Sequence, residues 1–401
     1  MATTDLLIIG GGVVGLSLAL EAKHRYGGRA VTLLEKESSC GLHASTRNSG
    51  VLHAGFYYAS DSLKARFTVE GNRRLTEFCL DRSLPVNRCG KLVVTRHESE
   101  LPALQEMVRR AEKNACDVRM VSEVEANELE PRIRTVGKAL FSPTTSSISP
   151  VLVMNELLRE ATALGVQIRS GCAYQGREGD KIIVGRGESI TAGHVVNAAG
   201  LYADSVAKDF GFSERHVILP FKGLYLLANQ GTERLQRHVY PVPDLANQFH
   251  LGLHFTVTVD GRTKIGPTAM PAFWREQYEG LENFRMREAF DVLKRQFVLF
   301  RKNDFGFRQL AVREMRKYSR GYMVQLASGL VNELQSKNFR EWGRPGIRAQ
   351  LFDTRANRLE LDFVVEGDDR STHVLNAVSP AFTCCFPFAE YVLDRIERVA
   401  S

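Results

Sequence analysis

The chain has 401 residues, with 53 Lys and Arg against 46 Asp and Glu, and a formal net charge of +7. Its 44% hydrophobic and 25% charged residues are typical of globular proteins, which excludes a disordered chain, a fibrous repeat and a small disulfide scaffold. The length is sufficient for about two to three domains. Seven cysteines without Cys-x-x-Cys spacing indicate reduced thiols and a cytoplasmic protein.

The apolar start of the chain predicts a strand over residues 4–9, a glycine-rich turn, a helix over 13–23 and a second strand over 30–35. This start is not typical of a signal peptide, because Asp5 precedes it and four glycines interrupt it. No segment approaches ~18 uninterrupted apolar residues, so the sequence predicts no transmembrane helix.

The remainder of the chain alternates between strand and helix patterns and contains no internal repeat. Strands are predicted at 91–95, 166–169, 181–184, 194–200 and 361–365, with a β-rich stretch at 218–267. Helices are predicted at 61–82, 99–116, 150–164, 284–335 and 380–398. This order of elements predicts an α/β fold.

The glycine-rich turn has the spacing of a dinucleotide-binding motif. Gly10, Gly12 and Gly15 form GxGxxG, with Val13 and Val14 in between, directly after a strand and at the start of a helix. The first glycine permits the tight turn, the second lets a pyrophosphate approach the backbone, and the third allows close contact between helix and strand. The N–H groups and the positive dipole end of the helix suit the phosphates.

Two further features narrow the choice of nucleotide. Glu35 stands twenty residues after Gly15, at the end of the second strand, where a carboxylate accepts hydrogen bonds from both ribose hydroxyls. Ala199 and Gly200 belong to VVNAAG, a strand that runs into a small-residue turn and offers a second close approach to a cofactor, or else an ordinary strand-to-helix turn. With the motif at the extreme N-terminus, these features favour FAD over NAD.

A series of longer motifs begins with HASTRNSGVLHAGFYY at residues 43–58 and runs through most of the chain. By these motifs the chain resembles the FAD-dependent oxidoreductases of the glycine oxidase and D-amino-acid oxidase type and, within that superfamily, the L-2-hydroxyglutarate dehydrogenase/oxidase family. The other motifs are GGGVVGLSLAL (10–20), SLKARFTVEG (62–71), CGKL (89–92), NAAGLYAD (197–204), PFKGLYLL (220–227), YPVPD (240–244), GLHFT (252–256), GPTA (266–269), GIRAQ (346–350) and NAVSPAFT (376–383).

The resemblance implies a two-domain FAD oxidoreductase with a Rossmann-like FAD-binding domain and a substrate domain built on a mixed or antiparallel sheet. The FAD-binding domain is expected from residues 1–85, 141–217 and 340–401, and the substrate domain from 86–140 and 218–339. The resemblance also implies that FAD is bound non-covalently. It further implies a helix that begins at Ser379 and Pro380 and whose N-terminus faces the flavin pyrimidine carbonyl. The implied contacts to FAD are Lys36, Ser45, Thr46, Asn48, Ser49, Gly50, Ser379, Pro380, Ala381 and Thr383.

Departures from the family pattern leave the substrate and the electron acceptor open. Lys222 stands where an arginine is expected, and Arg47 stands where a histidine is usual. Phe382, Cys384 and Cys385 replace smaller residues at the expected flavin edge.

The implied reaction is oxidation of L-2-hydroxyglutarate to 2-oxoglutarate, with hydride transfer from C2 to flavin N5 and onward transfer to a quinone or another acceptor. It needs a base for the hydroxyl proton, and histidine suits that role near neutral pH. His53, after the NSGV run, and His254, in an alternating strand with His250, are the candidates; each is otherwise a structural histidine. The His250 and His254 pair lacks a third ligand, so no metal site is expected.

Cations are expected to hold the carboxylates of the substrate. Arg348 and Lys222 are favoured, because a guanidinium binds a carboxylate through two hydrogen bonds and an ammonium offers a point charge; surface ion pairs are the alternative. Further residues are expected to line the pocket: Tyr57, Tyr58, Tyr225, Tyr240 and Lys91.

Residues 285–320 contain eleven basic and four acidic residues, so this segment carries the whole net charge of +7, and the other 365 residues are balanced with 42 of each sign. Because aromatic residues interleave with these charges, the segment is a candidate for peripheral contact with the inner face of an anionic inner membrane, where electrons pass to a quinone. The alternative is a solvated helical surface. No nucleic-acid-binding motif accompanies the charge.

Other functions are consistent with parts of the sequence. An enzyme that oxidises D-amino acids, glycine or sarcosine would use the same fold without a base for an alcohol. A non-catalytic FAD-binding membrane adaptor would need only the cofactor site and the basic segment. An NAD-linked hydroxy-acid dehydrogenase is disfavoured by the features that favour FAD.

Overall fold

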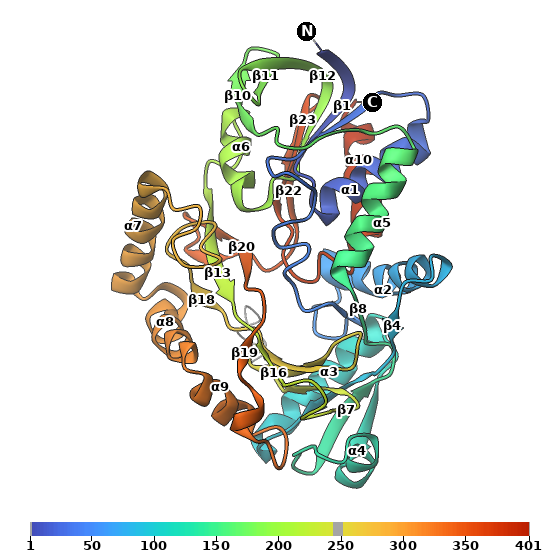
Figure 1. The fold of residues 1–401 in the computed structure, drawn as a ribbon, viewed down its shortest axis with the longest axis vertical. Coiled ribbons are helices and arrows are strands. Elements are labelled where there is room, and N and C mark those ends of the chain that lie inside the picture. Colours follow the sequence, from blue (N-terminus) through green and yellow to red (C-terminus); the bar gives the residue numbers. More distant parts are fainter. Residues whose placement is uncertain (1, 244–251, 401) are drawn as a thin grey trace. The chain divides into compact units, whose positions relative to one another are not determined.

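The computed structural model describes residues 2–243 and 252–400, and Figure 1 labels its helices and strands. Asp244 of the YPVPD motif and His250, the predicted partner of His254, lie outside the described residues. The chain divides into two units, each with its own internal contacts. Unit 1 comprises Met1–Asn48, Pro150–Pro220 and Arg348–Ser401, and unit 2 comprises Ser49–Ser149 and Phe221–Ile347.

Unit 1 is built around a largely parallel sheet. The strands β12 (Glu188–Asn197), β1 (Ala2–Ile9), β2 (Val31–Leu34) and β9 (Gln167–Arg169) follow one another in parallel, and β23 (Ser371–Asn376) pairs in parallel with β12. Antiparallel strands complete the sheet: β10 (Tyr174–Glu178), β11 (Lys181–Val184) and β22 (Val364–Gly367). The strand, helix and strand predicted at the start of the chain are confirmed.

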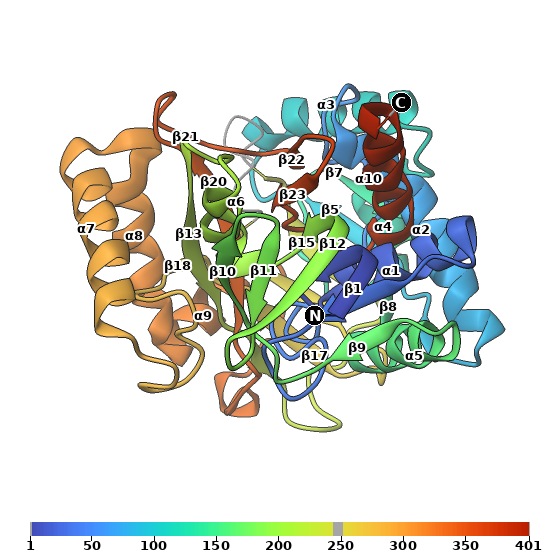
Figure 2. The same cartoon turned by 90° about the horizontal axis from the view of Figure 1, so that it is seen from above.

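The helix α1 (Val13–Tyr26) contacts both α5 (Pro150–Ala163) and α10 (Cys385–Ala400), and Figure 2 shows these helices beside one another. On the other side, α6 (Ala203–Asp209) lies against β23 and β10. Eight of the fourteen residues of α1 are buried, so this helix is central to the unit.

The predicted start of the last helix at residue 380 is wrong. The Ala381 N–H donates to the carbonyl of Val378, which closes a turn, and regular helix begins only at Cys385. The residue before a proline is biased away from helical backbone, which favours a turn at this point. The four predicted flavin contacts Ser379, Pro380, Ala381 and Thr383 therefore precede α10 instead of opening it.

The main sheet of unit 2 has the strand order β19-β14-β17-β16-β15-β5-β7-β6. At its centre, β15 (His238–Pro241) runs parallel to β5 (Lys91–Val94), and β16 (His254–Val257) is antiparallel to both β15 and β17 (Thr263–Gly266). The β-rich stretch predicted over 218–267 supplies β14 to β17. The outer strands are β7 (Lys138–Ser142), β6 (Arg119–Ser122), β14 (Leu226–Leu227) and β19 (Glu341–Trp342).

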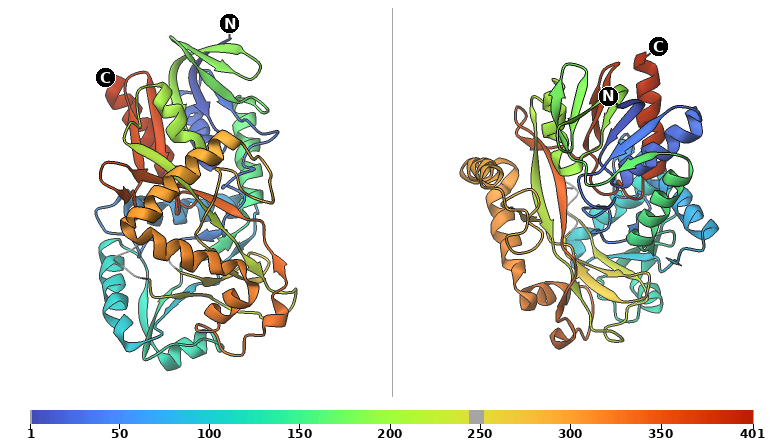
Figure 3. Two further views of the ribbon diagram at one scale, coloured as in Figure 1. Left: turned by 90° about the vertical axis from the view of Figure 1, so that its left-hand side faces the viewer. Right: turned by 45° about the horizontal axis from the view of Figure 1, so that its top comes forward.

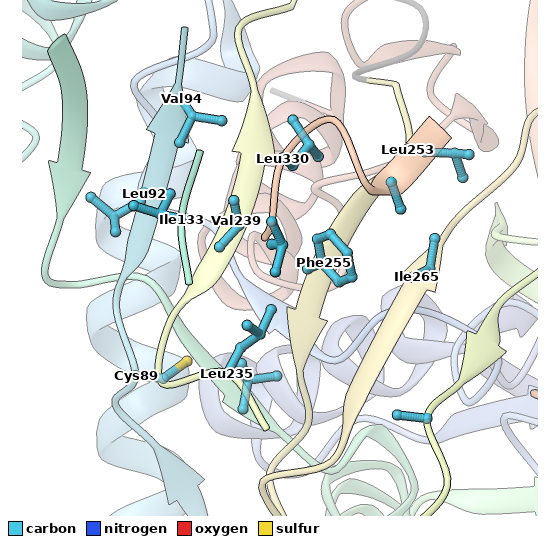
Figure 4. Packing of buried hydrophobic residues seen from close by; sticks show 14 of the residues in the cluster. Cys89, Leu92, Val94, Ile133, Leu235, Val239, Leu253, Phe255, Ile265 and Leu330 are labelled. Atoms are coloured by element: carbon cyan, nitrogen blue, oxygen red, sulfur yellow. The ribbon is translucent and has the colours of Figure 1, made fainter. Parts of the chain in front are cut away.

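Alternate residues of these strands point to opposite faces of the sheet. Leu92, Val239, Phe255 and Ile265 share one face and belong to the apolar core shown in Figure 4. The helix α9 (Arg320–Ala327) contributes buried residues to the same core. The alternate residues of β5, β15, β16 and β17, among them Lys91, His238 and Lys264, therefore lie on the opposite face.

Smaller elements complete unit 2. A short sheet pairs β8 (Ser146–Ile148) with β3 (Val51–Leu52) and β4 (Val86–Asn87). A further sheet has the order β18-β13-β20-β21, and the boundary between the units falls within β13 and β20. The remaining bounds are α2 (Leu63–Asp81), α3 (Leu101–Lys113), α4 (Glu123–Leu129), β13 (His216–Gly223), β18 (Met270–Pro271), β20 (Gly346–Asp353) and β21 (Arg358–Leu359).

The basic segment forms α7 (Met286–Lys302), α8 (Phe307–Met315) and the start of α9, drawn as orange helices in Figures 1 and 3. The helical stretch predicted over 284–335 is interrupted, because Asn303 and Gly306 have left-handed backbone with φ of 58° and 73° and end α7 before α8 begins. Among the residues that the structure describes, no helix combines the length and apolar character needed to cross a membrane.

Several strands were not predicted from the sequence, and β10 and β20 are two examples. β10 contains Gly176 and charged residues, and β20 begins with Gly346 and contains Arg348 and Gln350, so neither shows an apolar alternation. The predicted domain bounds differ from the two units. Residues 49–85, 141–149 and 340–347, predicted for the FAD-binding domain, belong to unit 2 by their contacts, and residues 218–220, predicted for the substrate domain, belong to unit 1.

Candidate functional site

The glycine-rich turn between β1 and α1 brings backbone atoms closer than any side chain allows. A Cβ on Gly15 would lie 1.9 Å from the Gly10 carbonyl oxygen, and a Cβ on Gly10 would lie 2.4 Å from the Ala198 carbonyl oxygen. Gly10 also has a φ of 113°, which L side chains rarely adopt. Gly12 is the N-cap of α1 and has no side chain of its own, so the helix presents backbone N–H groups that suit a phosphate.

Glu35 is fixed by the same turn. Its Oε2 accepts a hydrogen bond from the Gly11 N–H at 2.9 Å, and its Oε1 accepts one from the Glu37 N–H at 2.9 Å. The side chain is buried at the end of β2. Each carboxylate oxygen has a further lone pair, so Glu35 can hold ribose hydroxyls while the backbone keeps it in place.

The loop after β2 carries further predicted cofactor contacts. Ser45 Oγ accepts a hydrogen bond from the Val13 N–H at 2.9 Å, at the first residue of α1. Thr46 and Asn48 donate to backbone carbonyls within the same loop, which fixes its course. Lys36 Nζ lies over the Tyr202 ring, 5.8 Å from its centre. Ser45 therefore contacts the helix N-terminus, and its neighbours hold the loop that positions it.

Asn197 ends β12 and organises the turn that contains Ala199 and Gly200. Its Oδ1 accepts a hydrogen bond from the Ala199 N–H at 3.1 Å, and its Nδ2 donates to the Ala203 carbonyl at 2.8 Å. The Ala198 carbonyl of this turn lies against Gly10. The two turns thus meet at the carboxyl ends of adjacent parallel strands, the edge at which nucleotides bind in open α/β sheets.

In unit 2, buried polar side chains lie on the sheet face opposite the core of Figure 4. The strand register places Lys91 beside His238, and places Thr256 between His238 and Lys264. Each of the six residues concerned is at most 9% exposed. We call these six the polar face: Lys91, His238, Tyr240, His254, Thr256 and Lys264.

The two histidines of the polar face carry their protons on different nitrogens. The His254 Nδ1 lies 2.9 Å from the Gly252 carbonyl, which can only accept, so Nδ1 carries the proton and Nε2 carries the lone pair in the neutral ring. The His238 Nδ1 accepts from the Val257 N–H at 3.0 Å, so its proton is on Nε2. Burial lowers the pKa of His238 to about 3, with Lys91 adding to the shift, so His238 is a neutral structural residue.

Lys91 is fully buried within a group of aromatic rings. Its Nζ lies 4.2 Å from the centre of the Tyr240 ring, 5.2 Å from that of Tyr57 and 5.6 Å from that of Phe56. Among the described residues, no atom accepts a hydrogen bond from this nitrogen. Burial lowers the pKa of Lys91 to about 7, because the ammonium form loses its hydration.

Lys264 and His238 were not selected by the sequence analysis, although the register makes them neighbours of Thr256. Lys264 Nζ donates to the Ser49 carbonyl at 2.7 Å and lies 4.7 Å from the centre of the Tyr225 ring. Burial lowers its pKa to about 8. The strand period of two could have identified both residues. It places His238 on the same face as Tyr240, and Lys264 on the face opposite to the apolar Ile265.

The other predicted substrate residues lie outside the polar face. Lys222 is on β13, where burial lowers its pKa and the charge of Glu279 opposes the shift. Arg348 is half-buried on β20 in unit 1. His53 directly follows β3 and is buried, and Tyr58 faces Lys64, whose Nζ lies 6.0 Å from the ring centre.

Ligand-type side chains also gather in unit 1, where His216, Asp353 and Glu360 have atoms within 4.8 Å of one another. Arg215 Nε lies 3.3 Å from the Asp353 carboxylate and donates to His216 Nε2. Two of the three ligand-type side chains, Asp353 and His216, therefore already interact with Arg215.

A family model that describes FAD-dependent oxidoreductases matches residues 5–395. Several curated relatives are L-2-hydroxyglutarate dehydrogenases. The one from Salmonella houtenae is 31% identical over 410 residues, which cover 98% of this chain and 93% of the relative. The mitochondrial one from Homo sapiens is 30% identical over 418 residues, which cover 98% of this chain and 89% of the relative.

Solved structures share the fold. L-α-glycerophosphate oxidase from Mycoplasma pneumoniae, reduced with dithionite and with FAD bound, matches at a TM-score of 0.78 and 22% identity, covering 99% of this chain and 95% of that one. Glycine oxidase from Geobacillus kaustophilus matches at 0.73 and 18%, with coverage of 99% and 95%. These likenesses confirm the predicted fold class, and together with the family match they confirm FAD as the cofactor.

We expect Gly15→Ala to abolish FAD binding and to lower Tm by about 5 °C or more, because the new methyl group would force the turn and α1 apart. FAD retained after gel filtration, measured by flavin absorbance, is the readout. Gly28→Ala is the matched control, since no atom lies within 4 Å of its added Cβ. A Gly15→Ala protein that keeps stoichiometric FAD would contradict the role of this turn.

Proposed function

The chain belongs to the family of FAD-dependent oxidoreductases, and we propose that it oxidises L-2-hydroxyglutarate to 2-oxoglutarate. The observation that carries this proposal is the similarity, over nearly the whole chain, to L-2-hydroxyglutarate dehydrogenases. FAD would be held by the glycine turn, Glu35 and the Asn197 turn, and when bound it would supply the two-electron acceptor for the oxidation at C2 of the substrate. The protein itself has to bind the carboxylates, orient C2 and remove the hydroxyl proton.

We assign the cofactor to unit 1 and the substrate to unit 2. The glycine turn, Glu35 and the Asn197 turn are all in unit 1, and each offers a group that suits part of a dinucleotide. The polar face is in unit 2 and offers cations and a histidine. Ser49 and Gly50, which begin unit 2, stay predicted contacts of FAD.

His254 is the favoured acceptor of the hydroxyl proton. Its Nδ1 is held by the Gly252 carbonyl, so Nε2 of the neutral ring has the lone pair that a base requires. The ring stacks on Tyr240 at a centroid distance of 3.7 Å and an interplanar angle of 19°, which fixes its plane. His53 is the second candidate, since it is a buried histidine in the same unit.

Lys222 and Lys264, both in unit 2, are proposed to hold the substrate carboxylates, whereas Arg348, the other predicted cation, lies in unit 1. A lysine whose pKa is lowered by burial regains stability as an ammonium when an anion comes beside it, and burial lowers the pKa of both Lys222 and Lys264. The tyrosines at 57, 58, 225 and 240 are proposed to line the substrate pocket.

The basic segment is proposed to dock on an anionic membrane, where the electrons would pass to a quinone. The buried residues of α7 form one stripe, and a second apolar stripe of the same helix is exposed, with Phe290 and Phe297 each 65% exposed. Arg287, Lys294 and Arg301 are exposed at intervals of seven along the helix, so basic side chains accompany this stripe. The exposed apolar residues of α7 are Met286, Phe290, Leu293, Phe297, Val298 and Phe300.

We expect L-2-hydroxyglutarate to reduce the flavin of the purified protein without oxygen, and D-2-hydroxyglutarate to leave it oxidised. Flavin absorbance followed after anaerobic mixing measures this. Glycine, sarcosine and D-amino acids are tested in parallel. Reduction by one of these amines and not by L-2-hydroxyglutarate would assign the protein to the amine-oxidising enzymes, and a protein that stays colourless after reconstitution with FAD would contradict the cofactor.

We expect His254→Ala to slow anaerobic flavin reduction by L-2-hydroxyglutarate about 10²- to 10⁴-fold, because the alcohol loses its proton acceptor. His53→Ala tests the second candidate in the same assay. His97→Ala is the control, since this histidine is exposed. If His254→Ala reduces at the wild-type rate, the assignment of the base to His254 is wrong.

We expect the protein to sediment with vesicles that contain anionic lipid at low salt, and expect Lys294→Glu combined with Arg301→Glu to weaken this binding at least about tenfold, since each basic residue near such a surface contributes about 1 kcal/mol. Phe290→Ser with Phe297→Ser tests the apolar stripe. Lys138→Glu with Lys181→Glu reverses the same number of exposed charges elsewhere. Wild-type protein that stays in the supernatant at low salt would end this proposal.

A further inference from the structure

Lys91 is a buried titratable group to which the reaction proposed above gives no role. It is 0% exposed, so a substrate has no surface of this residue to touch. Its contacts among the described residues are the rings of Phe56, Tyr57 and Tyr240. An apolar residue would fill such a place at lower cost, because an ammonium without an anion or a hydrogen-bond acceptor is expensive to bury.

Tyr240 connects Lys91 to the proposed base. The strand β15 lies between β5 and β16, and its register sets Tyr240 beside His254. Lys91 lies opposite His238, which is two residues before Tyr240 on the same face of β15. Lys91 Nζ is 4.2 Å from the centre of the Tyr240 ring, and the His254 ring is 3.7 Å from the same centre. These two distances put the Lys91 nitrogen within about 8 Å of the imidazole centre, a range at which charges inside a protein influence each other.

We propose that Lys91 is a positioning residue for the oxidation: it holds the Tyr240 ring on which His254 stacks, and its positive charge keeps the His254 imidazole neutral and able to accept a proton. The inference rests on the proposed function, because His254 is taken as the base. Lys91 acts through its neighbours and not on the substrate.

The sign of the effect follows from the charge of Lys91. Below its pKa of about 7 the residue is an ammonium, and an ammonium disfavours the imidazolium form of a histidine nearby. His254 therefore stays neutral to lower pH than it would beside an uncharged residue. The charge of Lys91 also adds to the lowering of the His238 pKa by burial and opposes the rise that burial gives the pKa of Cys89, so the His254 ring has to be followed by its own signal. The titratable groups that face this region from the packed elements are Tyr57 after β3, Cys89 before β5, His238 and Tyr240 on β15, Lys264 on β17 and Tyr225 before β14.

The test compares the pH dependence of kcat/KM for L-2-hydroxyglutarate in the wild-type holoenzyme, Lys91→Met and Lys91→Arg. Methionine keeps the apolar stem and removes the charge, so we expect the acid limb of the profile to move up by about one pH unit. Arginine keeps the charge at all pH values used, and its limb should stay at or below that of the wild type. Lys138→Met, on the neighbouring strand β7 and exposed, is the matched control with an unchanged profile.

A Lys91→Met profile that falls in height but keeps the wild-type midpoint would reduce Lys91 to a packing residue and overturn the proposal. If Lys91→Met does not fold, as judged by FAD content and Tm, the comparison of wild type with Lys91→Arg still decides. In that comparison, an acid limb that moves up in Lys91→Arg contradicts the assigned charge effect.

A second measurement needs no turnover and separates this inference from the proposed function. NMR of the holoenzyme with ¹³C-labelled lysine should show one side chain that titrates near pH 7 and disappears in Lys91→Met. The His254 ring, assigned by its loss in His254→Gln, should titrate about one pH unit higher in Lys91→Met than in the wild type. A Lys91 midpoint near ~10.4, the ordinary lysine value, would overturn the inference even if L-2-hydroxyglutarate is the substrate. If L-2-hydroxyglutarate does not reduce the flavin, the proposed function is refuted. The titrations of Lys91 and His254 would then still test whether the charge of Lys91 acts on His254.

Discussion

The alternation of side chains along the central strands of unit 2 is the constraint on which its core and its candidate site both depend. Leu92, Val239, Phe255 and Ile265 face the apolar core, and the residue that precedes or follows each of them in its strand faces the other way. A shift of one residue in the pairing of any strand would turn its polar side chains into the core. The burial of the apolar face therefore fixes the register of the polar one. This coupling allows a sheet to hold charged and titratable side chains at defined places without many hydrogen bonds among them.

In unit 1 the candidate cofactor site is defined instead by close contacts between backbone atoms. Gly15, Gly10 and Ala198 touch where no side chain fits, and Glu35 is held by N–H groups of the main chain. The N-terminus of α1 offers partial positive charge at this turn. A site made of backbone needs particular residue types at fixed spacing, and for that reason it can be found in the sequence.

The same difference explains what sequence reasoning could and could not predict. The strand, turn and helix at the start of the chain, FAD as cofactor and the β-rich stretch 218–267 follow from local pattern and from motifs, and the structure and comparisons confirm them. The polar face depends on which strands pair, and β5 pairs with β15 across nearly 150 residues, so no local pattern brings Lys91 to Tyr240. The start of α10 was placed too early because the turn at Ser379 has the composition of a helix N-terminus. The strand β20 was missed because polar residues interrupt its pattern.

The distribution of charge along the chain bears on the kind of substrate that the polar face suits. The net charge of the chain comes from the segment 285–320, so by count the rest of the molecule is neutral. That balance conceals a local excess: Lys91 and Lys264 lie on one buried face, neither forms an ion pair with a described carboxylate, and His238 between them is held neutral. Lys264 donates to a carbonyl and Lys91 lies among aromatic rings, so among the described residues neither ammonium touches a carboxylate, although the charge of Asp260 acts on Lys264. An anion near this face would be attracted by both lysines in their ammonium form. This attraction suits a substrate that carries carboxylates, so it supports the proposed dicarboxylate hydroxy acid.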